Sequence, residues 1–296
     1  MSLPWRIDAI NNGDVSVINT LLPLATTPSF AFSRRPGGRG LRALCLVLGA
    51  CLLSPAQAAH NELKGTYFES TRVIYPETAR QGKSIVLNNN DDRDFLLQAY
   101  ISPPDAGGLP GAPTQDFLVT PPISRLNAHQ VRTLRVLRTG GAFPSDRESV
   151  FYLTAILIPS EAPPEAKRKV PEAQVKYRTG LSIKVFWRPQ GLDKPNAVEA
   201  AAGKLTAAIH GETLTLSNPT PYYVTLRTLS IGGADVPATS LTRMVPPLGH
   251  QDWTLPAGTK RAAVIPVIWT AIKENGFDTT PFLNPVAVSG ATTRTQ

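Results

Sequence analysis

Residues 174–187 read QVKYRTGLSIKVFW, and this stretch decides the fold class. Its apolar residues alternate with polar ones, a period of two that is typical of a β-strand. Shorter runs of the same kind precede and follow it, and turn-forming residues separate them. These runs lie at 66–75, 84–87, 95–101, 117–119, 131–137, 150–158, 204–209, 213–216, 222–231, 251–255 and 262–271. Many short strands joined by turns predict an all-β fold of the sandwich type.

The segment RPQGLDKP, residues 188–195, is the expected domain boundary. It follows the long strand and carries prolines and a glycine, which interrupt regular structure. We therefore divide the chain into an N-terminal extension with a signal peptide, residues 1–58, and two domains at 59–189 and 190–296. A short helix over 197–202 is expected after the boundary, with Asn196 as its N-cap.

An export signal is expected within residues 1–58. Residues 34–58 read RRPGGRGLRALCLVLGACLLSPAQA, in which arginines precede an apolar run and small residues precede Ala58. This order is that of a secretory signal peptide. The apolar run at 43–53 is too short to serve as a permanent membrane-spanning helix. The sequence therefore predicts export to the periplasm and cleavage near Ala58.

The sequence contains no recognisable catalytic, metal-binding or cofactor-binding motif. It has neither a phosphate-binding loop nor a dinucleotide fingerprint. The two cysteines, Cys45 and Cys51, lie in the segment expected to be removed, which excludes disulfides and thiolate chemistry from the mature chain. The histidines lack metal-ligand spacing; they are His60, His129, His210 and His250. We expect no enzyme activity, no metal, no cofactor and no small-molecule substrate.

The chain is basic, with a formal net charge of +8. Such a balance is compatible with nucleic-acid, membrane or acidic partners. The densest basic run, at 167–169, lies in a proline-rich loop without the aromatic residues that accompany nucleic-acid binding. We therefore expect no nucleic-acid partner and interpret the charge as a solvated surface.

Five segments resemble, in chain order, the motifs of PapD-like periplasmic pilus (fimbrial) chaperones of the chaperone–usher pathway. They are TRVIY at 71–75, TPPISRL at 120–126, DRESVFY at 146–152, IKVFWRP at 183–189 and NPTPYYVT at 218–225. Each segment alone also fits an ordinary strand or turn, but together they cover roughly residues 63–290. The resemblance implies two immunoglobulin-like β-sandwich domains in an L-shaped arrangement.

The resemblance also implies a function. Members of this family bind, stabilise and deliver pilin subunits for pilus assembly by donor-strand complementation, without ATP. Their partners are the pilin subunits and an outer-membrane usher.

Two cations lie inside otherwise apolar strands. Arg72 and Lys184 each interrupt a run of apolar residues, and a buried cation is costly unless it is paired. From the residues alone, a solvated strand face or an internal ion pair accounts for both cations. The resemblance implies instead that they anchor the C-terminal carboxylate of the pilin.

Other site residues follow from the resemblance. Charged contacts between the two domains are implied at Glu148, Arg188 and Glu274, the last of which replaces the aspartate usual in the family. The donor strand is implied within 174–183. Since side chains alternate across a strand, one face carries Val175, Tyr177, Thr179, Leu181 and Ile183. Thr179 is more polar than the usual family residue.

Two alternatives come from other functional classes. A secreted β-sandwich binding module, such as an adhesin or glycan-binding protein, shares the fold but does not need Arg72 and Lys184 together. A secreted hydrolase needs a catalytic constellation, which the sequence does not display.

Overall fold

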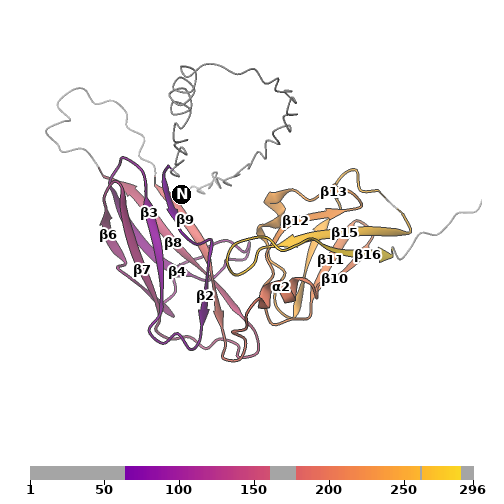
Figure 1. Ribbon diagram of the computed structural model, residues 1–296, viewed down its shortest axis with the longest axis horizontal. Coiled ribbons are helices and arrows are strands. Elements are labelled where there is room, and N and C mark those ends of the chain that lie inside the picture. The colour runs from indigo at the N-terminus through magenta and orange to yellow at the C-terminus, as the bar shows by residue number, and fades with distance from the viewer. Residues whose placement is uncertain (1–63, 161–177, 261, 288–296) are drawn as a thin grey trace, which may run out of the picture. The chain divides into compact units, whose positions relative to one another are not determined.

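The computed structural model describes residues 64–160, 178–260 and 262–287, and almost all of its regular structure is β-strand (Figure 1). The strands up to the predicted boundary are β1 (Thr66–Phe68), β2 (Arg72–Pro76), β3 (Lys83–Asn89), β4 (Phe95–Ser102), β5 (Phe117–Thr120), β6 (Ile123–Leu126), β7 (Gln130–Arg138), β8 (Ser149–Pro159) and β9 (Thr179–Arg188). Beyond it lie α2 (Ala197–Ala202), β10 (Thr206–His210), β11 (Thr213–Asn218), β12 (Leu226–Ile231), β13 (Ala234–Asp235), η2 (Ala238–Thr242), β14 (Gly249–Thr254), β15 (Val264–Ala271) and β16 (Phe282–Ala287). No helix in these ranges is long and apolar enough to cross a membrane.

The strands before residue 189 form two sheets that share one core. The sheet orders are β1-β3-β7-β5 and β2-β9-β8-β4-β6. Alternate residues of both sheets point inward, as Leu134 of β7 and Leu153 of β8 do, and neither is accessible to solvent. This arrangement is that of a β-sandwich.

The strands after residue 200 repeat this arrangement. Their sheets are β10-β11-β14 and β13-β12-β15-β16. A second core lies between these sheets and includes Trp269, Leu214 and Leu216. In Figure 1 the strands coloured from indigo through magenta to salmon, with β9 as the last, form the first sandwich, and the orange-to-yellow strands form the second. The prediction of an all-β fold is confirmed.

Strand β9 has different neighbours along its two halves. It forms an antiparallel ladder with β8 from Thr179 to Trp187. On its other edge it pairs in parallel with β2, and that ladder begins where Arg72 lies opposite Lys184. Among the described strands, the edge of β9 from Thr179 to Ile183 therefore has no partner other than β8.

The predicted helix after the boundary is present as α2, but the prediction of its N-cap is wrong. Asn196 adopts a left-handed conformation with φ of 54° and makes no side-chain capping bond. An N-cap residue needs an extended backbone to reach the first free amides. The Val198 amide donates instead to Glu274 Oε1 at 3.0 Å, so a carboxylate distant in sequence takes the place of the cap.

Some strand limits also differ from those expected. The run at 66–75 is divided, because β1 joins one sheet and β2 the other. Strand β16 was not expected. Its residues 282–287 contain a proline, which is tolerated here because β16 is the last strand in its sheet.

Candidate functional site

The ladder between β2 and β9 places two cations side by side. Arg72 and Lys184 are direct partners in this ladder, so their side chains project from the same face of the sheet. Their neighbours Val73 and Val185 point the other way, into the core. Both cations therefore lie on the face of the sheet that is turned away from the core.

Arg72 is almost fully enclosed, with 8% of its surface exposed. Its Nη1 donates to the Ile272 carbonyl at 3.0 Å, and its guanidinium carbon lies 5.8 Å from the centre of the Phe186 ring. Its Nε is buried without a hydrogen-bond partner in the described structure. Burial is the main reason why the pKa of Arg72 is lowered to about 10.

The positive charge of Lys184 also has little compensation from its surroundings. The described residues supply it with neither a hydrogen bond nor an ion pair. Burial, followed by the positive charge of Arg72, lowers the pKa of Lys184 from 10.5 to about 8. The charge of Glu274 acts on Arg72, but no carboxylate of the described residues forms an ion pair with either cation. Two adjacent, desolvated cations of this kind form a site for an anion.

The cation pair marks the point where the unpaired edge of β9 begins. Beyond it, Ser182, Leu181 and Thr179 run outward with only β8 beside them. Leu181 packs against the core at its margin, and Ile183 is buried in it with 9% exposure. Thr179 is exposed. Val175 and Tyr177 lie outside the described residues.

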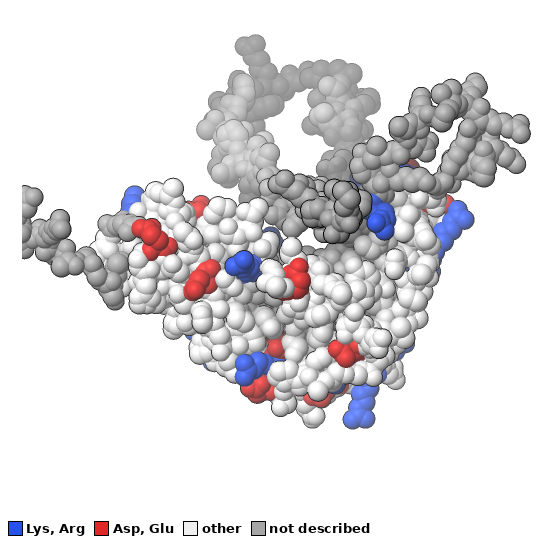
Figure 2. Space-filling view, turned by 180° about the vertical axis from the view of Figure 1, so that it is seen from behind, with Lys and Arg blue, Asp and Glu red and all other residues white. Residues whose placement is uncertain are grey.

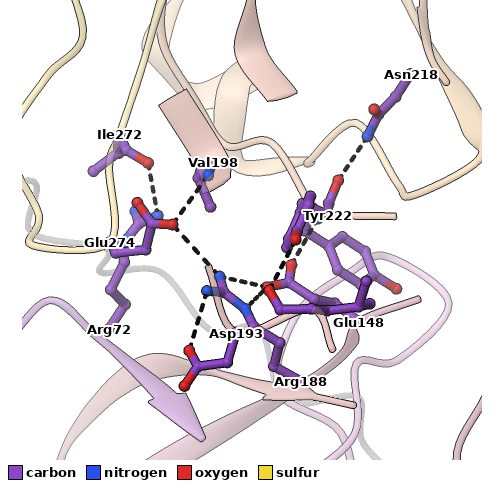
Figure 3. A network of polar contacts seen from close by, with 11 residues as sticks. Arg72, Glu148, Arg188, Asp193, Val198, Asn218, Tyr222, Ile272 and Glu274 are labelled. Atoms are coloured by element: carbon purple, nitrogen blue, oxygen red, sulfur yellow. Dashed lines mark hydrogen bonds and ion pairs between the residues drawn. The ribbon is translucent and has the colours of Figure 1, made fainter. Parts of the chain in front are cut away.

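A second charged cluster is centred on Arg188, whose exposure is only 1%. Its Nε and Nη2 both lie 2.8 Å from Glu148 Oε1. Glu274 Oε1 lies 3.6 Å from Nη2, and Asp193 Oδ1 lies 3.7 Å from Nη1. Figure 3 shows these carboxylates converging on the one guanidinium. The structure thus brings together Glu148, Arg188 and Glu274.

This cluster connects the two sandwiches. Glu148 Oε2 accepts a hydrogen bond from the Tyr223 amide at 2.8 Å, and Glu274 of the second sandwich lies 3.6 Å from Arg188 of the first. Burial raises the pKa of Glu148, and the nearby Arg188 opposes that rise. Sequence reasoning missed Asp193, a side chain within the boundary segment, and the backbone groups of Tyr223 and Ile272. The two backbone groups could not be found, because a main-chain contact leaves no pattern of residue types.

Outside these two clusters we looked for a metal site and a nucleic-acid-binding surface among the described residues. The described ranges contain no group of three or more His, Cys, Asp and Glu side chains able to hold a metal ion. Figure 2 shows one face of the protein, on which charges of both signs are scattered between neutral surfaces. That face has no basic stripe of the kind that binds nucleic acid.

Comparisons with known proteins identify the family. The family model described as "Pili and flagellar-assembly chaperone, PapD N-terminal domain" matches residues 65–193. The model described as "Pili assembly chaperone PapD, C-terminal domain" matches residues 200–282.

Individual relatives agree with these matches. The probable fimbrial chaperone protein ElfD of Escherichia coli strain K12 is 33% identical over 237 residues, which cover 80% of this chain and 93% of ElfD. The Escherichia coli chaperone protein FocC is 36% identical over 195 residues, 66% of this chain and 79% of FocC. The solved structure of the Salmonella enterica SafB chaperone with the SafA pilin has a TM-score of 0.63 and 27% identity, and the match covers 75% of this chain and 97% of the other.

The chain belongs to the PapD-like pilus-assembly chaperones of the chaperone–usher pathway. The resemblance seen in the sequence motifs is therefore confirmed. These matches are to chaperones and do not favour an adhesin or glycan-binding module.

Proposed function

We propose that this protein captures pilin subunits in the periplasm, holds each subunit's C-terminal carboxylate with Arg72 and Lys184, and lends it the free edge of β9. One observation carries the proposal. Two neighbouring cations, neither of which forms an ion pair with a carboxylate of the described residues, lie where the unpaired edge of the strand begins. A chain end that enters this site gains charge-assisted hydrogen bonds and a backbone partner together.

The unpaired edge explains how a subunit is held beyond its last residue. A strand edge presents backbone N–H and C=O groups, and an incoming strand satisfies them by β-strand addition. Donor-strand complementation between chaperones and pilins is an established example of this mode. Main-chain hydrogen bonds supply affinity, and alternate side chains enter the groove of the partner.

The proposed donor face comprises Val175, Tyr177, Thr179, Leu181 and Ile183. Its inner members, Leu181 and Ile183, already pack against the chaperone's own core. The contribution to the pilin therefore comes chiefly from the outer members. Each large apolar side chain buried in a pilin groove contributes about 1.5–3 kcal/mol, and Thr179 contributes less.

Export and domain division belong to the same proposal. The signal sequence ends at Ala58, so the mature protein starts at Ala59, with domains at 59–189 and 190–296. The buried cluster of Glu148, Arg188 and Glu274 fixes the contact between these domains. The protein acts without ATP, cofactor or catalytic step and delivers its cargo to an outer-membrane usher.

Recovery from the periplasm tests the proposal directly. The tagged full-length protein is expressed in a pilus-forming host, and its periplasmic complex is isolated. We expect an N-terminus at Ala59 by sequencing and a pilin subunit as the co-purifying protein. A cytoplasmic protein that retains residues 1–58, or a periplasmic protein that does not bring a pilin with it, contradicts the proposal.

Pilin binding is expected to weaken at alkaline pH. Lys184 titrates at about 8 in the free protein, and a bound carboxylate favours its charged form, so its pKa is higher in the complex. Affinity is therefore greatest below pH 8 and falls above it. The loss between pH 7 and 9 is expected to approach about tenfold. Arg72, with a pKa of about 10, keeps most of its charge over this interval.

The control for this pH dependence is Lys184→Arg, which keeps the charge at all these pH values. Its dissociation constant for the recovered pilin, measured by calorimetry, is expected to change little from pH 7 to 9. If wild type and Lys184→Arg respond equally to pH, titration of Lys184 does not govern binding.

The donor register is expected to follow residue parity. Val175→Asn and Tyr177→Asn place a polar group in an apolar groove, which costs roughly 1–3 kcal/mol beyond the lost burial. Lys176→Asn and Arg178→Asn act on the opposite face and are expected to leave binding almost unchanged. Thr179→Val is expected to bind equally well or more tightly. Competition for one pilin among these variants measures the pattern. Since a slip of one residue exchanges the faces, losses confined to the even-numbered positions rule out this register.

A further inference from the structure

A loop between β4 and β5 covers part of the face that carries the cation pair. Tyr152 of β8 is the direct ladder partner of Lys184, so the two side chains lie together on this face. The Tyr152 hydroxyl donates to the Gly108 carbonyl at 2.5 Å, and its side chain is buried. The loop at 103–113 therefore reaches across to the immediate neighbour of the proposed carboxylate anchor.

This loop is held by its own hydrogen bonds. Asp105 Oδ1 accepts from the Gly107 and Leu109 amides at 2.8 and 2.9 Å. The Asp105 amide donates to the Leu109 carbonyl at 2.7 Å, and the Gly111 amide donates to the Pro103 carbonyl at 2.9 Å. A loop closed in this way is preorganised, so a ligand that contacts it loses little free energy in ordering it.

The loop presents an apolar side chain to solvent next to this tyrosine contact. Leu109 directly follows Gly108 and is 45% exposed. On the other side of the cations, the Ile272 carbonyl holds Arg72, and the Tyr223 ring lies 6.0 Å from that of Phe186. The cation pair is thus flanked by the loop on one side and by residues of the second sandwich on the other.

We infer that the 103–113 loop is a second wall of the anchor site, and that Leu109 contacts the last side chains of the bound pilin and favours subunits whose C-terminal residues are apolar. This inference rests on the proposed function. Two observations support it: the cations are able to take the terminal carboxylate, and the exposed Leu109 follows the residue that contacts Tyr152, the ladder partner of Lys184. An apolar side chain at this place complements an apolar residue adjoining the carboxylate.

The test compares Leu109→Ser with Leu118→Ser. Leu118 is a matched control, because it is 47% exposed but lies on β5 in the other sheet of the same sandwich. The probe is the pilin recovered from the periplasm with this protein. Leu109→Ser is expected to bind it about tenfold more weakly, which corresponds to about 1.4 kcal/mol, whereas Leu118→Ser binds as wild type does. Equal affinities for the two variants overturn the inference.

A double-mutant cycle locates the contact. The last apolar residue of the pilin is replaced by alanine, which is expected to weaken binding to the wild-type chaperone but not to Leu109→Ser. Equal weakening in both chaperones overturns the inference.

Arg72→Ala is measured alongside, to separate a failure of this inference from a failure of the proposed function. If it loses binding while Leu109→Ser does not, the loop has no role and the proposed function stands. If Arg72→Ala also binds normally, the proposed anchor itself fails.

Discussion

Arg72→Ala and Lys184→Ala are each expected to weaken pilin capture strongly while the chaperone stays folded. Each change removes charge-assisted hydrogen bonds to the subunit's carboxylate, worth about 1.5–3 kcal/mol or more. The lost affinity is therefore about tenfold to more than a hundredfold for each variant. Because both cations act on one carboxylate, the double variant is expected to lose less than the sum of the two single losses.

The stability of the free chaperone separates this role from a structural one. Lys184 is desolvated and has no partner among the described residues, so its charge opposes folding in the absence of pilin. Lys184→Met is therefore expected to unfold at the same urea concentration as wild type or a higher one, although it does not bind pilin. Lys204→Ala, at an exposed lysine of the second sandwich, is the control and is expected to bind normally. Normal pilin binding by Lys184→Met contradicts the anchor.

Glu148→Ala is expected to lower the free energy of unfolding by about 3–5 kcal/mol, because it leaves Arg188 buried without its main partner. Glu148 is 2% exposed and holds both the Arg188 guanidinium and the Tyr223 amide. The change therefore removes an ion pair and a contact between the two sandwiches together. Urea unfolding measures the loss.

The neighbouring residue Asp146 provides the matched control. Asp146 also pairs with an arginine, Arg147, at 2.8 Å, but the pair is exposed to solvent. Asp146→Ala is expected to leave the unfolding curve unchanged, because exposed ion pairs contribute little. The double variant Glu148→Leu with Arg188→Met is expected to recover much of the stability, since an apolar pair replaces a buried ionic one at small cost. Equal curves for Glu148→Ala and Asp146→Ala show that the buried cluster does not stabilise the fold.

The sequence was sufficient to predict the fold class and to suggest candidate residues for the site. Alternation of apolar and polar residues predicted most strands, and a cation within each of two apolar runs, together with the family resemblance, pointed to Arg72 and Lys184. It was not sufficient to predict the strand pairing that brings these two residues together. The parallel ladder that joins them pairs segments far apart in the chain, and local periodicity carries no information about such pairing.

The N-cap of α2 shows a similar limit. Asn196 had the residue type of a cap, but a glutamate from the segment between β15 and β16 binds the helix amide instead. Local propensity indicates which residues are able to cap a helix. The tertiary structure determines which one does.

The open edge of β9 has a consequence for the range of cargo that one such protein is able to serve. Peptide groups are the same in every polypeptide, so hydrogen bonds to the backbone of this strand edge do not distinguish one subunit sequence from another. Different subunits therefore compete for the same strand edge. The fraction of chaperone bound to each subunit follows the abundance of that subunit as well as its affinity. Any preference among subunits arises from the few side chains beside this strand edge, where a single substitution is enough to change which subunit is bound first.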